Sequence, residues 1–122
     1  MEAPFDFSCL TRLGVPLQHF DAGEKIFLED EIGACMFVVR SGRVDVITFG
    51  RALEKIGPDG IFGEMALITD EPRSAAAMAA EATEVAVIDR DAFLALVRQE
   101  PQFALRIMRV LAERIRRMNP AS

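Results

Sequence analysis

Four short runs of β-branched and aromatic residues, separated by glycine-bearing turns, limit what this chain can fold into more than any other feature. They are KIFL at 25–28, MFVV at 36–39, VDVI at 44–47 and VAVI at 85–88. Such residues favour extended backbone, and short strands at this spacing are typical of an all-β sandwich or barrel. The pattern therefore predicts a β-domain over residues 19–89.

Helical patterns flank these runs. After Asp89 the hydrophobic period changes from two to about 3.6 residues, which indicates helices. We expect one helix at 91–100, introduced by a capping aspartate and ended before a proline, and a second from 102 to about 118. A shorter helix is expected at 7–13. The predicted fold class is mainly β with flanking helices.

The length of 122 residues is that of one domain, and 51% hydrophobic residues is too rich a composition for a disordered chain. We expect a single domain over 1–122. It would consist of an N-terminal helical segment at 1–18, the β-domain at 19–89 and C-terminal helices at 90–119.

The segment FGEMAL at 62–67, followed by Arg73, carries groups suited to a sugar phosphate. Gly63 leads into a short apolar turn whose first backbone N–H groups are free to face an anion. The Arg73 guanidinium can bind two phosphate oxygens at once. Glu64 would repel a phosphate, so we expect it to accept hydrogen bonds from hydroxyls, as from a ribose.

Taken singly, these residues have ordinary explanations. Gly63 could end a strand, and Glu64 and Arg73 could form an exposed ion pair worth under about 1 kcal/mol. Taken together, their spacing favours the pocket.

This segment, with Arg73-Ser74-Ala75 and Pro72 before it, resembles the phosphate-binding cassette of the cyclic nucleotide-binding domain family. The family includes catabolite-activator-type bacterial regulators, regulatory subunits of cyclic-AMP-dependent kinase and nucleotide-gated channels. The resemblance implies a double-stranded β-helix, that is, a jelly-roll or cupin-like β-roll, with the cassette at 61–75. A cyclic mononucleotide is the implied ligand.

The resemblance also implies the roles of individual residues. Glu64 would hold the ribose 2′-hydroxyl, Arg73 the cyclic phosphate, and Ser74 would add a hydroxyl to that phosphate. The backbone of four further residues would line the same pocket: Gly63, Met65, Ala66 and Ala75. Val46, on a central strand, is an expected apolar contact for the base.

Serine after the arginine is common in cyclic AMP binders of this family, whereas threonine often accompanies cyclic GMP. Ser74 therefore favours cyclic AMP, with cyclic GMP as the other candidate. The alanine-rich run at 75–80 has two explanations, which are close approach of the backbone to a ligand and a tightly packed strand.

Two turn positions depart from the family pattern. Asp30 stands where the family has glycine, and Asp59-Gly60 reverses the usual Gly-Asp order. Aspartate tolerates left-handed backbone better than most residues, so we expect both turns to form.

The last helix carries two apolar stripes. Phe103, Ile107 and Val110 are expected to pack on the β-roll. The second stripe has heptad spacing and could be a homodimer seam, a lid over the nucleotide or simple packing. It consists of Ala104, Met108, Leu111, Ile115 and Met118.

In transcription factors of this family a helix-turn-helix domain follows the last helix, whereas this sequence ends at Ser122. We expect no attached output domain, and a signal passed to an unknown protein partner.

Charge, hydropathy and residue types argue against a DNA-binding, membrane-spanning or catalytic protein. The first 100 residues carry 9 basic and 18 acidic side chains, so DNA binding is not expected. No apolar stretch approaches the roughly 18 residues of a membrane span, and residues 1–6 do not resemble a signal peptide, so the expected location is cytoplasmic. His19 is the only histidine, and no metal-binding or catalytic set includes it, so we expect neither an enzyme nor a metal site. The alternative function is a ligand-free interaction or dimerisation module on the same fold.

Overall fold

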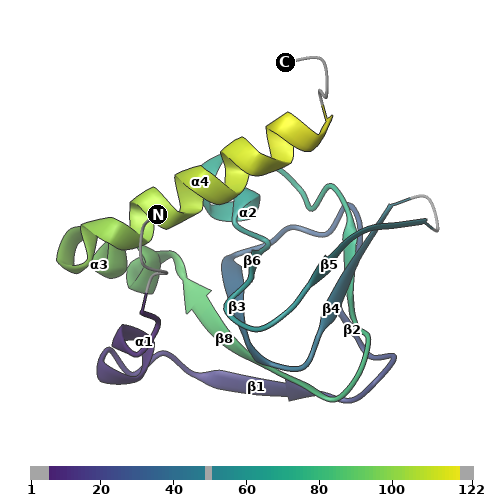
Figure 1. Cartoon of the computed structure of the whole chain (residues 1–122), viewed down its shortest axis with the longest axis horizontal. Helices are drawn as coiled ribbons and strands as arrows, with labels where there is room; N and C mark the ends of the chain where they lie inside the picture. Colours follow the sequence, from purple (N-terminus) through teal and green to yellow (C-terminus); the bar gives the residue numbers. More distant parts are fainter. Residues whose placement is uncertain (1–5, 49–50, 119–122) are drawn as a thin grey trace.

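The computed structural model describes residues 6–48 and 51–118, and the side chains at 51–53 and 118 are not described. Within these ranges, eight strands form two four-stranded antiparallel sheets (Figure 1). One sheet has the order β1-β8-β3-β6 and the other β2-β7-β4-β5. The strands are β1 (Leu17–Phe20), β2 (Lys25–Phe27), β3 (Cys35–Ser41), β4 (Val44–Thr48), β5 (Arg51–Ile56), β6 (Ile61–Phe62), β7 (Ala76–Ala79) and β8 (Thr83–Asp89). The predicted mainly β fold with flanking helices is confirmed.

The central strand β3 of the first sheet is buried on both faces. On β3, Met36 and Val38 belong to one hydrophobic cluster, which includes helical residues, while Phe37 and Val39 belong to a second cluster inside the roll. A strand covered on both faces has no polar face, so its sequence is a continuous apolar run. This is why 36–39 and 85–88 were recognisable as strands.

The edge strand β5 was not predicted. Its sequence, RALEKI, is rich in residues that favour helices, and its charged members include Glu54 and Lys55. Pairing with β4 determines its conformation, since β propensity depends strongly on tertiary context.

Four helices flank the sheets within the described residues: α1 (Cys9–Arg12), α2 (Met65–Ile68), α3 (Arg90–Gln99) and α4 (Pro101–Met118). The Asp89 carboxylate caps α3 by accepting from the Ala92 N–H at 2.8 Å. The helices predicted at 7–13, 91–100 and 102–118 are therefore present with shifted ends. Pro101 begins α4, as proline is tolerated in a first turn whose N–H groups lack helical partners.

Both turns with an unusual aspartate form as expected. Asp30 has φ 70° and Asp59 has φ 67°, so each aspartate adopts the left-handed backbone that glycine adopts most easily.

The alanine run at 75–80 also has an observed role, because Ala77 and Ala79 are fully buried on β7.

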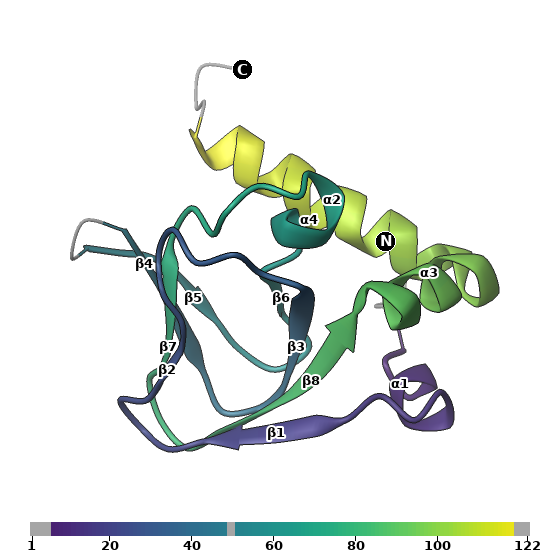
Figure 2. The same cartoon turned by 180° about the vertical axis from the view of Figure 1, so that it is seen from behind.

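The long helix α4 passes across one end of the β-roll, close to α2 (Figures 1 and 2). Phe103 and Ile107 are buried in the helix-side cluster, and Val110 packs against it, as predicted. In the second stripe, Met108 is 63% exposed and Ile115 is 65% exposed. The side chain of Met118 lies outside the described residues. In the described part of the chain, no helix is long and apolar enough to cross a membrane.

Candidate functional site

A cavity of about 680 Å³ lies between the β-roll and α4. All eight residues predicted for the ligand site line it: Val46, Gly63, Glu64, Met65, Ala66, Arg73, Ser74 and Ala75. Further lining residues come from the strands, from the segment before Arg73 and from α4: Phe27, Thr48, Glu54, Phe62, Pro72, Leu111, Arg114, Ile115 and Arg117. The fold thus brings the cassette, strand β4 and the last helix around one space.

Arg73 is buried, with 6% of its surface exposed. Its Nη1 donates to the Gly63 carbonyl at 2.6 Å and its Nη2 to the Cys35 carbonyl at 2.7 Å. Its Cζ lies 4.1 Å from the centroid of the Phe27 ring, in cation–π geometry. Its Nε is buried without a partner among the described residues. The guanidinium carries five N–H groups, so Nη1 and Nη2 each keep a second N–H for another acceptor.

Glycines make room for this guanidinium. A Cβ at Gly33 would lie 2.4 Å from Arg73 Cζ, and one at Gly63 would lie 2.8 Å from Arg73 Nη1. Gly63 also has φ 76°, which L side chains rarely adopt. The position of Arg73 thus depends on glycine at both places.

The charge of Arg73 is stabilised by dipoles. In the described part of the chain it forms no ion pair with a carboxylate, and its two bonded partners are backbone carbonyls. Burial lowers the pKa of the Arg73 guanidinium below its ordinary value, and weaker opposing contributions come from Cys35, Glu31 and Glu64. An anion in the cavity would relieve this under-compensated charge.

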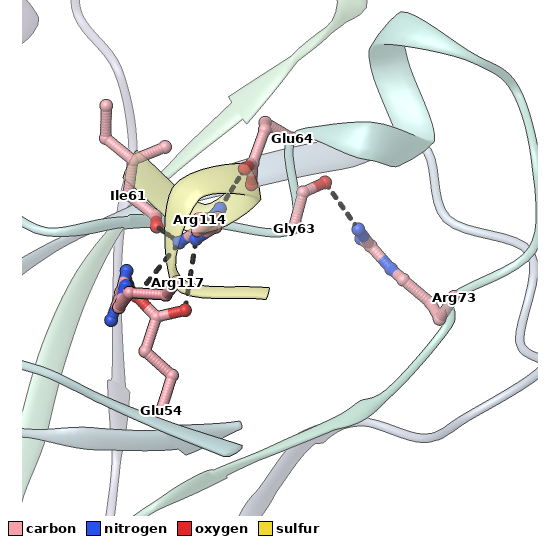
Figure 3. A network of polar contacts seen from close by, with 7 residues as sticks. All are labelled: Glu54, Ile61, Gly63, Glu64, Arg73, Arg114 and Arg117. Carbon is pink, nitrogen blue, oxygen red and sulfur yellow. Dashed lines mark hydrogen bonds and ion pairs between the residues drawn. The ribbon is translucent and has the colours of Figure 1, made fainter. Parts of the chain in front are cut away.

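Glu64 is nearly inaccessible, with 2% of its surface exposed, and it forms an ion pair with Arg114 of α4. Arg114 also donates to the Ile61 carbonyl at 2.7 Å and, through Nε, to Glu54 Oε1 at 3.0 Å. Figure 3 shows Arg114 between the two glutamates, with Arg73 bonded to Gly63 beside them. The exposed Glu64–Arg73 pair considered from the sequence is not what forms.

The cassette turn itself is α2. The N–H groups of Leu67 and Ile68 bond to the Glu64 carbonyl at 3.0 and 3.2 Å. The preceding N–H groups, of Met65 and Ala66, come before the first bonded turn and so have no helical acceptor. Both residues line the cavity.

A model of the cyclic nucleotide-binding domain family matches residues 17–100, more than half of the chain. The chain belongs to this family. The cyclic AMP receptor protein of Thermus thermophilus is 35% identical over 102 residues, which cover 80% of this chain and 47% of that protein. The chain spans about half the length of the curated relatives it matches.

Solved structures share the fold of this cyclic nucleotide-binding domain. The crystal structure of the Thermus thermophilus catabolite activator protein is 32% identical with a TM-score of 0.82, covering 93% of this chain and 55% of that one. A structure reported for a cyclic-GMP-dependent signalling pathway that regulates bacterial phytopathogenesis is 28% identical with a TM-score of 0.75, covering 93% of this chain and 96% of that one. The predicted β-roll is confirmed.

Sequence reasoning missed three charged residues that line the site of this cyclic nucleotide-binding domain. Arg114 and Arg117 stand near the end of a helix, where basic residues suit the negative end of its dipole, so their position alone gives no reason to assign them to the site, and Glu54 received no role. One signal pointed to Arg114, because it lies three residues after Leu111 and one before Ile115, on the face that was considered as a lid. Glu54 had no comparable signal, because its partners lie 60 or more residues away in the sequence.

Among the described residues, no group of three or more histidine, cysteine, aspartate or glutamate side chains is placed to hold an ion. The polar atoms of the cavity wall are instead guanidinium, carboxylate and backbone N–H groups, which suit an organic anion with hydroxyls.

Proposed function

We propose that this domain binds a cyclic mononucleotide, preferably cyclic AMP, in the cavity between the β-roll and α4. The proposal rests on two buried groups that line one cavity. One is the Arg73 guanidinium, which has no carboxylate partner among the described residues, and the other is the Glu64 carboxylate. These are the two groups that a cyclic phosphate and a ribose hydroxyl respectively require.

The phosphate would lie at Arg73. The Arg73 guanidinium has five N–H groups and gives one from each Nη nitrogen to a carbonyl, so further donors remain, and the N–H groups of Met65 and Ala66 would add neutral donors. Ser74 is exposed and lines the cavity, so its hydroxyl can reach the same anion. These charge-assisted bonds would supply much of the affinity, since they are roughly twice as strong as neutral ones.

The ribose would lie at Glu64. One Glu64 oxygen is bonded to Arg114, and a carboxylate accepts about four hydrogen bonds in all, so capacity remains for the 2′-hydroxyl. Ligand and helix would then share a single carboxylate. A nucleotide bound here therefore contacts both the cassette and the residue to which α4 is bonded.

The preference for cyclic AMP rests on the resemblance at Ser74, with the base placed over Val46. The names of the similar proteins do not decide it, since one is a cyclic AMP receptor and another belongs to a cyclic-GMP-dependent pathway. Cyclic GMP is the competing ligand.

The signal would leave through α4. Leu111, Arg114 and Ile115 line the cavity, while Met108 and Ile115 also present exposed apolar surface. The nucleotide would shift α4 between two arrangements, by no more than its difference in affinity for them. The receiver would be a protein partner or a second copy of the chain, docked on the stripe that includes Met108, Leu111, Ile115 and Met118. In this proposal one helix is both lid and interaction surface.

A second candidate function is a ligand-free interaction module. It is favoured by the contacts that the site residues make within the chain. Glu64 is bonded to Arg114, and two Arg73 nitrogens are bonded to backbone carbonyls, so the chain itself satisfies part of the hydrogen-bonding capacity of the pocket. Light scattering on a variant with Leu111 and Ile115 made polar tests the interaction surface, because an altered assembly state is expected only if α4 is a seam.

Isothermal titration calorimetry with cyclic AMP and cyclic GMP tests the binding function. We expect both to bind, with cyclic AMP the tighter. No heat of binding with either nucleotide up to millimolar concentration would reject the proposal and leave the interaction module.

A further inference from the structure

The short helix α2 forms part of the cavity wall, and its own hydrogen bonds are too few to stabilise it. It consists of four residues, Met65–Ile68, whereas isolated helices shorter than about 12 residues are marginal in water. Three backbone hydrogen bonds close its turns, with the N–H groups of Leu67, Ile68 and Thr69 as donors. Other parts of the chain must therefore hold α2 in place.

The start of α2 is held by α4. Glu64, the N-cap residue of α2, forms the buried ion pair with Arg114 described above. The side chain of Leu67 is also buried, in the cluster that includes Leu96 of α3 and Phe103 of α4. The first end of α2 and one of its faces are thus held by the C-terminal helices.

The other end of α2 is held by Arg90, the first residue of α3. Arg90 Nη1 donates to the Leu67 carbonyl at 3.4 Å, and Nη2 forms an ion pair with Asp70, which follows the helix with φ 59°. The last carbonyls of a helix have no partner within it, and a basic side chain near that end can bond them. The N–H of Glu71, four residues after Leu67, donates to Thr69 Oγ1. Arg90 therefore caps α2 from 23 residues away in the sequence.

We propose that Arg90 is a positioning residue, which holds α2 in the arrangement that the nucleotide requires. The proposal rests on the nucleotide-binding function given above and adds a residue that does not line the cavity. Without Arg90 the last turn of α2 opens part of the time, and the nucleotide binds only those molecules in which α2 is formed. The apparent affinity is then reduced by the fraction in which it is formed.

Amide hydrogen exchange and calorimetry on the full chain with Arg90→Met test the proposal. Cyclic AMP affinity should fall by about threefold, which corresponds to α2 being formed in about one third of the molecules. Without nucleotide, the amides of Leu67, Ile68 and Thr69 should lose most of their protection from exchange, and saturation with cyclic AMP should restore it. The urea midpoint should not change, because Arg90 and Asp70 are 51% and 71% exposed and such ion pairs contribute little to global stability.

The matched control is Arg12→Met. Arg12 pairs at 2.9 Å with Glu100, which lies at the other end of α3, and neither residue lines the cavity. This change also removes an arginine that forms an ion pair at one end of α3, so its α2 exchange and its affinity should equal those of the wild type. Arg90→Lys should lie between the wild type and Arg90→Met, because an ammonium lacks the planar fork that binds two acceptors at once.

The outcomes separate this proposal from the binding function. If the wild type binds cyclic AMP and Arg90→Met keeps both its affinity and the protection of α2, the positioning role is overturned. An equal loss of affinity in Arg12→Met overturns it, and so does a loss of affinity in Arg90→Met without faster exchange in α2. If the wild type binds no cyclic nucleotide, the binding function itself is wrong, and the positioning role falls with it.

Discussion

Two arginines line the same cavity from opposite walls, and the protein holds them in different ways. Arg73, on the β-roll side, bonds to two backbone carbonyls and stacks on Phe27. Arg114, on α4, lies between Glu54 and Glu64 and also bonds to a carbonyl.

The difference lies in what balances each charge. Carbonyl dipoles orient the Arg73 guanidinium but carry only partial charge, so its positive charge remains available to an anion. The charge of Arg114 is balanced by full carboxylates. Arg73 is therefore suited to bind a ligand, whereas Arg114 is suited to hold two parts of the chain together. Variants of each wall test this distinction.

The largest expected effect is the loss of ligand binding in Arg73→Met. Two charge-assisted bonds to the phosphate, at roughly 1.5 to 3 kcal/mol each, would be removed, so cyclic AMP affinity should fall by about 4 kcal/mol. Calorimetry measures this, with circular dichroism to verify folding. The matched control is Arg43→Met, because Arg43 pairs with Asp45 away from the cavity wall. Unchanged affinity in Arg73→Met would show that Arg73 does not bind the phosphate.

The second effect is on stability. Arg114→Met leaves the buried Glu64 carboxylate without its cation, and removing one partner of a buried pair typically costs about 3 kcal/mol or more. Urea unfolding without ligand should show a loss of about 3 kcal/mol. The double variant Arg114→Met with Glu64→Gln should recover much of it, because the unpaired charge is then removed. A double variant no more stable than Arg114→Met would contradict the role of Arg114 in holding two parts of the chain together.

The third effect tests the ribose at Glu64. Replacement by glutamine should weaken cyclic AMP by about 1 to 2 kcal/mol, since the 2′-hydroxyl loses a charged acceptor. The 2′-deoxy analogue should bind the wild type more weakly by a similar amount. It should lose little further affinity in Glu64→Gln, because the hydroxyl is already absent. If the loss from the 2′-deoxy analogue and the loss from Glu64→Gln were additive, the 2′-hydroxyl would contact a group other than Glu64.

The smallest effect concerns the support of Arg73. Gly33→Ala should weaken cyclic AMP by about 1 kcal/mol, because the new Cβ displaces the guanidinium from its position. Gly57→Ala is the matched control, since a Cβ there meets no atom within 4 Å. Its affinity and stability should stay close to those of the wild type. Equal affinities in the two variants would mean that Arg73 adjusts at no cost.

How far the sequence predicts the structure differs between elements. The runs at 36–39 and 85–88 and the turns at Asp30 and Asp59 follow from local rules, and they are present. Strand β5 was missed, since its residues favour helices and only the pairing with β4 makes it a strand. The last helix was predicted with its apolar faces, but periodicity shows which residues share a face and not what that face contacts.

The same limit applies to the site. Residue type and spacing pointed to Gly63, Glu64 and Arg73, and the resemblance to the family implied the other five predicted lining residues. The contacts of Arg114 with Glu64 and Glu54 span 50 and 60 residues of sequence, and nothing local encodes them.

The sequence by itself determined strands β2, β3, β4 and β8, the three predicted helices and the chemical groups of the cassette, because these depend on residue type and short spacing. Only the tertiary structure decided what partners those groups have. It surrounded Arg73 with carbonyls, bonded Glu64 to α4 and brought Glu54 to the cavity wall beside Arg114. The physical reason is that side-chain partners are selected by packing between distant segments, and the charge of a residue does not specify which opposite charge it will meet.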